Sequence, residues 1–78
     1  MTTEASRYTY VIKHDEDEGY FIGFCLEFPL LSADGLTVEQ AYAAIEEVVF
    51  CAIQDSVTDG DSYPAPLSVD EVLAELHA

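Results

Sequence analysis

Apolar residues first recur at alternate positions, a spacing that predicts two β-strands near the start of the chain. Tyr8–Lys13 is rich in aromatic and β-branched residues, and its apolar side chains fall on one face at a period of two. Tyr20–Phe28 continues this pattern over a longer stretch. The polar segment between them ends at Gly19, so we expect the two strands to pair as an antiparallel hairpin.

The second expected strand is apolar on both of its faces. One face carries Tyr20, Ile22, Phe24, Leu26 and Phe28, and the other carries Phe21 and Cys25. A strand that is apolar on both faces is covered on both. Because one helix covers only one face, the other face requires a second cover.

The spacing then changes to that of a helix. Pro29 is expected to end the second strand, and Leu31–Ala33 predicts a short third strand. Thr37 and Gln40 have the spacing of a capping box, so a helix is expected from Val38 to about Val57. Eight apolar side chains fall within an arc of about 140° on this helix: Val38, Ala41, Tyr42, Ile45, Val48, Val49, Ala52 and Ile53.

The last twenty residues predict a connection and a second, shorter helix. Residues 58–67 contain two prolines, which favour an extended backbone. Ser68 and Glu71 form a second capping-box spacing, and a terminal helix is expected over 68–77. Its apolar side consists of Val69, Val72, Leu73 and Leu76. So short a helix is marginal alone, so we expect it to pack against another surface.

These elements predict one α+β domain over residues 1–78. A small antiparallel sheet, made of the hairpin and the short third strand, is expected to pack on one main helix, with a short helix at the C-terminus. Residues 1–7 are polar and are expected to be loose. A chain of 78 residues cannot contain more than one domain of ordinary size.

The charge balance restricts the possible partners. Sixteen Asp and Glu residues accompany only Arg7 and Lys13, giving a formal net charge of −14. Such a surface repels phosphate backbones and anionic lipid, so direct binding of nucleic acid or membrane is not expected. A basic protein would be attracted, although solubility alone is an alternative role for the carboxylates.

The cysteines and the N-terminus point to the cytoplasm. Cys25 and Cys51 each lie in an apolar run, which is typical of buried structural thiols. The first seven residues contain no apolar stretch of the kind found in signal peptides. No apolar run approaches the roughly 20 residues that span a bilayer.

Several short motifs follow one another in an order that resembles the HicB-like antitoxins. They are Tyr8, Val11-Ile12, Asp15–Tyr20, Glu27-Phe28-Pro29, Gly35-Leu36-Thr37 and Glu39-Gln40-Ala41. The resemblance covers residues 8 to about 57 and implies a partial RNase H-like fold. It also implies that the protein binds and neutralises a HicA-type toxin. Toxins of that type are small basic ribonucleases with a double-stranded-RNA-binding-like fold, and they cut mRNA.

The chain departs from this family at identifiable places. Leu26 and Leu30 stand where the family usually has Pro and Gly, and Leu36 stands where it usually has an acidic residue. The stretch that commonly forms a fourth strand predicts a helix here. Many members also carry a C-terminal DNA-binding domain, and the eleven residues after Leu67 are too few for one.

Catalytic and metal chemistry is not expected. Asp15–Glu18 does not fit a calcium-binding EF-hand loop, because Tyr20 falls where that loop needs Gly. The four carboxylates are therefore expected to form a solvated turn or to contact a basic partner. His14 and His77 show no triad-like spacing with a nucleophile. We expect no cofactor, and we expect the aromatic residues of the strands to form core rather than a ligand cage.

The leading functional hypothesis is an antitoxin-like protein that covers the RNA-binding face of a basic ribonuclease. The residues expected to contact this partner are Asp15, Glu16, Asp17, Glu18, Glu39, Glu46 and Glu47. A stand-alone oligomeric scaffold or adaptor without a toxin partner is the alternative, and a metal-dependent hydrolase is a third class.

A homo-oligomer, most simply a dimer, is expected from the surplus of apolar residues. Phe21 and Cys25 lie on one face of the second strand, and Phe50 projects from the acidic side of the main helix. We expect these three residues at the interface between subunits, since a monomer would leave Phe50 in water. Alternatively, the terminal helix folds back and covers Phe50 within one chain.

Overall fold

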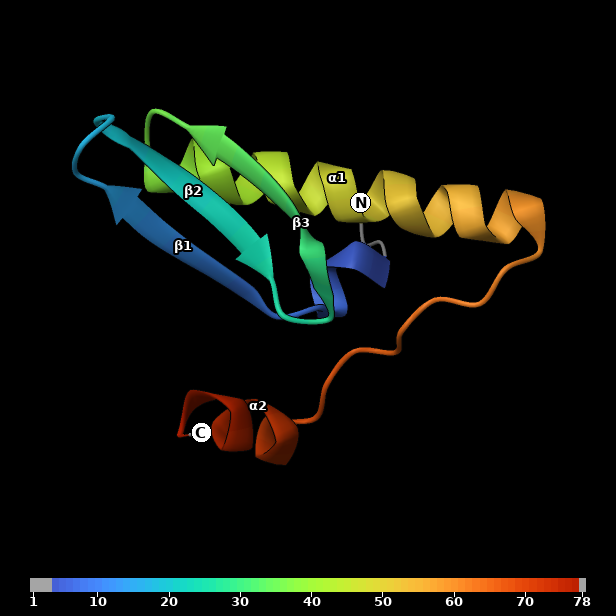
Figure 1. The fold of residues 1–78 in the computed structure, drawn as a ribbon. Coiled ribbons are helices and arrows are strands. Elements are labelled where there is room, and N and C mark those ends of the chain that lie inside the picture. Colours follow the sequence, from blue (N-terminus) through green and yellow to red (C-terminus); the bar gives the residue numbers. More distant parts are fainter. Residues whose placement is uncertain (1–3, 78) are drawn as a thin grey trace.

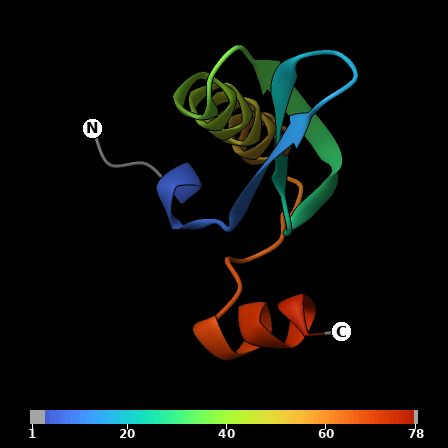
Figure 2. The same ribbon diagram turned by 90° about the vertical axis from the view of Figure 1, so that its left-hand side faces the viewer.

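The computed structural model describes residues 4–77 and has an α+β architecture (Figure 1). Its elements are the 3-10 helix η1 (Glu4–Arg7), the strands β1 (Tyr10–Asp15), β2 (Tyr20–Cys25) and β3 (Phe28–Gly35), and the helices α1 (Val38–Asp59) and α2 (Val69–Leu76). The strands form an antiparallel sheet in the order β1-β2-β3. α1 covers one face of this sheet and leaves the other face open (Figure 2). The predicted fold class is confirmed.

The strand register decides which side chains face α1. Tyr10 pairs with Cys25, and Ile12 pairs with Gly23. These pairs lie on the covered face, because Gly23 touches α1 and Cys25 is buried in the core. Side chains alternate along a strand, so the intervening pair, Val11 and Phe24, lies on the open face.

The face of β2 that packs on α1 is therefore not the one expected from the sequence. Phe21 and Cys25 belong to the face that α1 covers, and Cys25 is buried within its own chain. The prediction of Cys25 as an interface residue is wrong, because its thiol is not accessible to a second subunit. The period of two defined the two faces, but it did not indicate which face the helix would cover.

The third strand is longer than predicted. β2 ends at Cys25, and Leu26 and Glu27 form the turn into β3. Pro29 is the second residue of β3 rather than the residue that ends β2. Proline is tolerated there because β3 is an edge strand, where an absent N–H breaks no ladder.

The core lies between the sheet and α1. Four residues at helical spacing on α1 are buried: Ala41, Ile45, Val49 and Ile53. The helix approaches β2 so closely that a Cβ atom on Gly23 would lie 2.7 Å from Cγ2 of Ile45 and 2.8 Å from the carbonyl oxygen of Ala41. Glycine is therefore required at this position for the two layers to meet.

Local hydrogen bonds define the ends of α1. The Thr37 hydroxyl accepts from the N–H of Gln40 at 3.1 Å, as the capping-box spacing predicts. The Gln40 side chain accepts from the N–H of Leu36 at 2.9 Å rather than from that of Thr37. The helix ends two residues beyond the predicted end, at Asp59, because Gly60 adopts the left-handed conformation with φ 75°.

Phe50 is covered within the chain by a route that the sequence did not predict. It is half-buried and packs against the core cluster, which includes Ala5 and Tyr8. Ala5 belongs to η1, so the segment expected to be loose is folded from Glu4 onward, while residues 1–3 lie outside the described range. The prediction that a monomer leaves Phe50 in water is wrong.

At the end of the C-terminal arm (residues 61–77), α2 stands apart from both layers (Figures 1 and 2), whereas Tyr63 in the extended part packs against the core. The extended part leads to α2, which packs on no other helix or strand of the described chain. Both capping-box hydrogen bonds between Ser68 and Glu71 are present, as predicted. The Cα radius of gyration is 13.1 Å, whereas a compact 78-residue domain is expected to have about 11.5 Å. α2 does not pack on α1, so the terminal helix does not fold back over Phe50.

Candidate partner-binding surface

The carboxylate of Asp15 organises the acidic turn between β1 and β2. Its Oδ1 accepts hydrogen bonds from the N–H groups of Asp17 at 3.1 Å and Glu18 at 3.2 Å. The carbonyl oxygen of Asp15 accepts from the N–H of Gly19 at 2.8 Å, and Gly19 takes the positive φ of 78° that closes the turn. Asp15 therefore folds the turn, while the side chains of Glu16, Asp17 and Glu18 are exposed.

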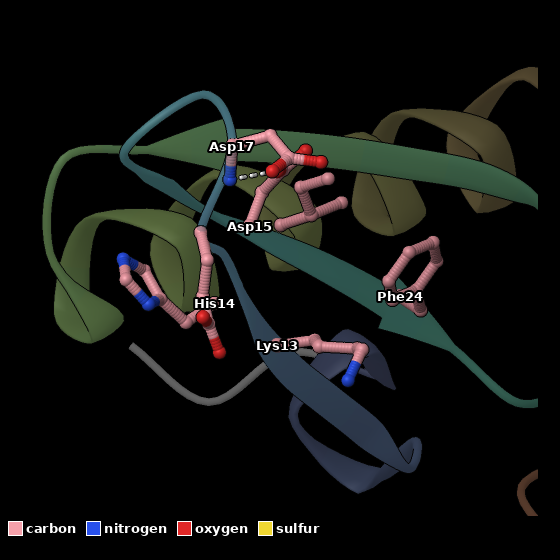
Figure 3. A pocket seen from close by; sticks show the side chains of 7 residues that line it. Lys13, His14, Asp15, Asp17 and Phe24 are labelled. Atoms are coloured by element: carbon pink, nitrogen blue, oxygen red, sulfur yellow. Dashed lines mark hydrogen bonds between the residues drawn. The ribbon is translucent and has the colours of Figure 1, made fainter.

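A hollow of about 510 Å³ lies beside this turn. It is lined by Lys13, His14, Asp15, Glu16, Asp17, Ile22 and Phe24. Asp15 and Asp17 meet at the turn, whereas Lys13 and Phe24 lie farther along the strands (Figure 3). The hollow thus combines carboxylates at one end with apolar surface of the open sheet face at the other. A protein partner could contact both.

The other predicted contact residues lie on α1. Glu39 is exposed in the first turn of α1, at the same end of the molecule as the acidic turn (Figure 1). Glu46 lies farther along the helix and accepts from the Tyr42 hydroxyl at 3.4 Å. Burial and the neighbouring Glu46 carboxylate raise the pKa of Tyr42. Glu47 lines a different hollow with Cys51. The structure therefore brings Glu39 and the turn to one end and does not bring Glu46 and Glu47 there.

Glu27 has structural importance that was not predicted from the sequence. It is only 8% exposed. Its carboxylate accepts hydrogen bonds from three residues, Thr9, Cys25 and Leu67. Oε1 accepts from the Thr9 N–H at 3.0 Å and from the Cys25 thiol at 3.4 Å. Oε2 accepts from the Thr9 hydroxyl at 3.0 Å and from the Leu67 N–H at 2.8 Å. Glu27 thereby joins β1, the β2–β3 turn and the C-terminal arm.

These contacts change the acidity of two side chains. Burial alone would raise the pKa of Glu27, but the donated hydrogen bonds from Leu67 and Thr9 outweigh it and hold this pKa below its usual value. Burial, reinforced by the hydrogen bond to Glu27, raises the pKa of the Cys25 thiol to about 11. A carboxyl residue inside the apolar run Phe24–Phe28 was the available sequence signal for such a buried anchor.

The two cysteines have different environments. Cys25 is buried, as predicted, but Cys51 is exposed on α1, so the prediction of a buried thiol there is wrong. An apolar run on a helix does not bury every member, because residues one position apart point about 100° away from one another.

The remaining candidate groups take no part in a recognisable reaction centre. His14 stacks against Phe21 with ring centroids 4.7 Å apart, and His77 is the C-cap residue of α2. Within residues 4–77, no three His, Cys, Asp or Glu side chains are grouped so that they could hold a metal ion. No helix in the described part of the chain is long and apolar enough to cross a membrane.

Comparison with family models, with curated proteins and with solved structures found no match to this chain.

Proposed function

We propose that this protein is antitoxin-like and neutralises a small basic ribonuclease of the HicA type by covering its RNA-binding face. One observation carries the proposal: the acidic turn is held by Asp15 so that Glu16, Asp17 and Glu18 project into solvent beside an open apolar sheet face. Carboxylates bordering an apolar area have the composition of a protein-binding surface with a charged rim.

The charge of the whole chain supports a basic partner. A formal net charge of −14 repels RNA, so the chain has no electrostatic reason to bind the nucleic acid itself. The same charge attracts a basic protein over a distance of several ångströms and accelerates encounter, up to about 10⁸–10⁹ M⁻¹s⁻¹ at low salt. The antitoxin would therefore occupy the surface that the toxin uses for RNA phosphates.

The mechanism is steric and electrostatic occlusion. Glu16, Asp17 and Glu18 match the phosphates in sign, and Glu39 adds negative charge at the same end of the molecule. Ile22, which lines the hollow beside the turn, is available for apolar contacts that distinguish the toxin from other basic proteins. Since the proposed target acts on mRNA, we place the protein in the cytoplasm.

The test compares two variants with the same change of charge. Glu16→Gln, Asp17→Asn and Glu18→Gln together remove three charges from the turn and leave Asp15 to hold its shape. Asp55→Asn, Asp59→Asn and Asp61→Asn together remove three exposed charges near the far end of α1. The partner to be tested is a small basic ribonuclease of the HicA type, sought in the reading frames beside that of this chain.

We expect the turn variant to associate about tenfold more slowly than wild type in low salt and to inhibit RNA cleavage less well. The control variant should remain close to wild type. The difference should shrink near 1 M salt, where the screening length is about 3 Å. Equal rates for the two variants, or the absence of any such ribonuclease beside the chain, would contradict the proposal.

A stand-alone oligomeric scaffold or adaptor is the second candidate. It is favoured by a specific observation, namely that α2 has an exposed apolar side and packs on no other helix or strand of the described chain. A scaffold of this kind would need no ribonuclease, and its loss would leave RNA cleavage in the cell unchanged. Inhibition of a cognate ribonuclease by the purified chain separates the two functions.

A further inference from the structure

The open sheet face carries an apolar patch that nothing in the described chain covers. Val11 and Phe24 are direct cross-strand neighbours, and both side chains are exposed on this face. Adjacent apolar side chains on a sheet face are normally buried by a second layer.

The apolar side of α2 presents the complementary problem. Val69, Leu73 and Leu76 are all exposed, and no residue of α2 is buried. An isolated helix needs roughly 12–15 residues to be even marginally stable in water, and α2 has eight. Its capping box fixes where it begins but gives its apolar side no contact, so α2 requires a surface to pack on.

The anchor of the C-terminal arm keeps α2 away from its own sheet. The N–H of Leu67, two residues before α2, donates to Glu27 at 2.8 Å, and the Tyr8 hydroxyl donates to the carbonyl oxygen of Pro64. α2 therefore begins near the β2–β3 turn, at the opposite end of the sheet from the acidic turn, and projects outward (Figures 1 and 2).

The exposed area matches what one additional interface would bury. A compact monomer of this mass, 8.6 kDa, is expected to expose about 4,700 Å². The chain exposes 5474 Å². The difference, about 800 Å², equals the area that each partner contributes to a standard protein interface. The helix also fits within the length of the sheet, because eight helical residues span about 12 Å and a six-residue strand spans about 20 Å.

The charges of the two surfaces are compatible with contact between two copies of the chain. Lys13, the only lysine of the chain, stands two residues after Val11 on the open face, which also carries Asp15 and Asp34. The polar side of α2 carries Asp70, Glu71 and Glu75 and no Lys or Arg. The open sheet face therefore has no layer over it, and α2, which is apolar on one side and acidic on the other, has no surface to pack on.

We propose that α2 of one copy docks on the open sheet face of a second copy, over Val11 and Phe24, and that the two copies exchange their C-terminal arms reciprocally. Such an exchange has two-fold symmetry, so it closes with two chains and buries both patches. The dimer does not depend on the proposed ribonuclease, and the acidic turn lies at the opposite end of the sheet. Added salt strengthens the dimer by screening the repulsion between two chains of −14, whereas it weakens binding to a basic protein.

The test is the mass of the full-length chain in solution at micromolar concentration and near-physiological salt. Multi-angle light scattering should give twice 8.6 kDa for the wild type. Leu73→Gln on α2 and Phe24→Gln on the open face should each raise the dimer Kd at least tenfold. Leu36→Gln is the matched control, because Leu36 is 75% exposed but belongs to neither patch. Its Kd should stay within about twofold of wild type, in line with the small effects of surface substitutions.

Mixing the two defective variants tests the exchange itself. Leu73→Gln keeps an intact face, and Phe24→Gln keeps an intact helix, so one arm in a mixed pair can dock. We expect the mixture to dimerise more tightly than either variant alone. Circular dichroism checks that each variant is folded.

Three outcomes would overturn the proposal. One is a wild-type mass of 8.6 kDa at all salt concentrations. Another is a folded Phe24→Gln variant that dimerises as tightly as wild type. The third is a mixture that behaves as the average of its two components, since that would mean that α2 does not dock on a second copy.

Discussion

The two α-helices of this protein have the same kind of N-cap but differ in how many side chains they bury. Thr37 caps α1 and Ser68 caps α2, each by accepting a hydrogen bond from the N–H three residues later. α1 then buries four side chains against the sheet, whereas α2 buries none. The comparison shows that local hydrogen bonds determine where a helix starts, and that tertiary packing determines whether the helix belongs to a core.

The folded unit, residues 4–60, and the C-terminal arm also differ in how they are held. The folded unit is joined through a continuous core from η1 across the sheet to α1. Among the contacts that hold the arm are the hydrogen bonds from Leu67 to Glu27 and from Tyr8 to Pro64, both of them before α2 begins. Substitutions should therefore act through different quantities in the two regions.

The labelling rates of the two cysteines should show the largest difference, because Cys25 can react only when the sheet and α1 separate. At pH 8, an aromatic disulfide reagent should label the exposed Cys51 readily. Cys25 should react at least about a thousandfold more slowly, because its thiol must first be uncovered by opening and its pKa is raised to about 11. The variants Cys25→Ser and Cys51→Ser assign the two rates. Comparable rates would mean that the sheet and α1 separate easily.

Truncation of a core residue should distinguish the regions by stability. Ile45→Ala should lower the free energy of unfolding by about 2–5 kcal/mol at every protein concentration, because Ile45 is fully buried. Leu73→Ala should cost less than about 0.5 kcal/mol in dilute solution, where α2 has no partner. Urea unfolding followed by circular dichroism measures both. A large effect of Leu73→Ala in the monomer would place α2 in the core.

The close approach of α1 to the sheet predicts an effect of overpacking. Gly23→Ala should destabilise the folded unit by about 1–3 kcal/mol, because the added methyl group would lie 2.7 Å from Ile45 and 2.8 Å from a backbone oxygen. Ser32→Ala, at an exposed position of the neighbouring strand β3, is the control and should have little effect on stability. Unfolding curves that coincide for wild type and Gly23→Ala would show that the two layers have room between them.

Glu27 should couple the two regions in a pH-dependent way. Its folded-state pKa is depressed, so its contribution to stability is present above its unfolded pKa of about 4.3 and is lost as the pH falls through the folded value. Glu27→Gln should cost about 1–2 kcal/mol at pH 7, because a neutral amide replaces the charged acceptor. The cost should vanish in acid. Glu47→Gln, at an exposed site, is the control and should change the free energy of unfolding by less than about 0.5 kcal/mol at pH 7. A cost for Glu27→Gln that stays constant from pH 7 to pH 2 would contradict this role.

Much of the fold was predictable because it depends on local spacing. The hairpin, both helix caps and the apolar stripe of α1 follow from side-chain periodicity and from short hydrogen bonds near Thr37 and Ser68. The strand boundaries were less accurate, since Pro29 is compatible with an edge strand and the sequence did not show that β3 would be one.

The errors arose where distant segments meet. The cover over Phe50 comes from a core that includes Ala5 and Tyr8, more than forty residues earlier in the chain. The role of Glu27 depends on Leu67, forty residues later. Likewise, no pattern within β2 indicated that α1 would cover Cys25 rather than Phe24. The acidic turn was predicted as a group, but the specific function of Asp15 in folding it required the geometry.

The measurement that tests the central claim most directly is an NMR titration of the isotopically labelled chain with a small basic ribonuclease of the HicA type. We expect amide shift changes centred on Glu16, Asp17 and Glu18. The changes should extend to Glu39 and to the hollow at Ile22, and they should decrease as the salt concentration is raised. Changes confined to the far end of α1 and the C-terminal arm, or no changes with the ribonuclease in excess, would contradict it.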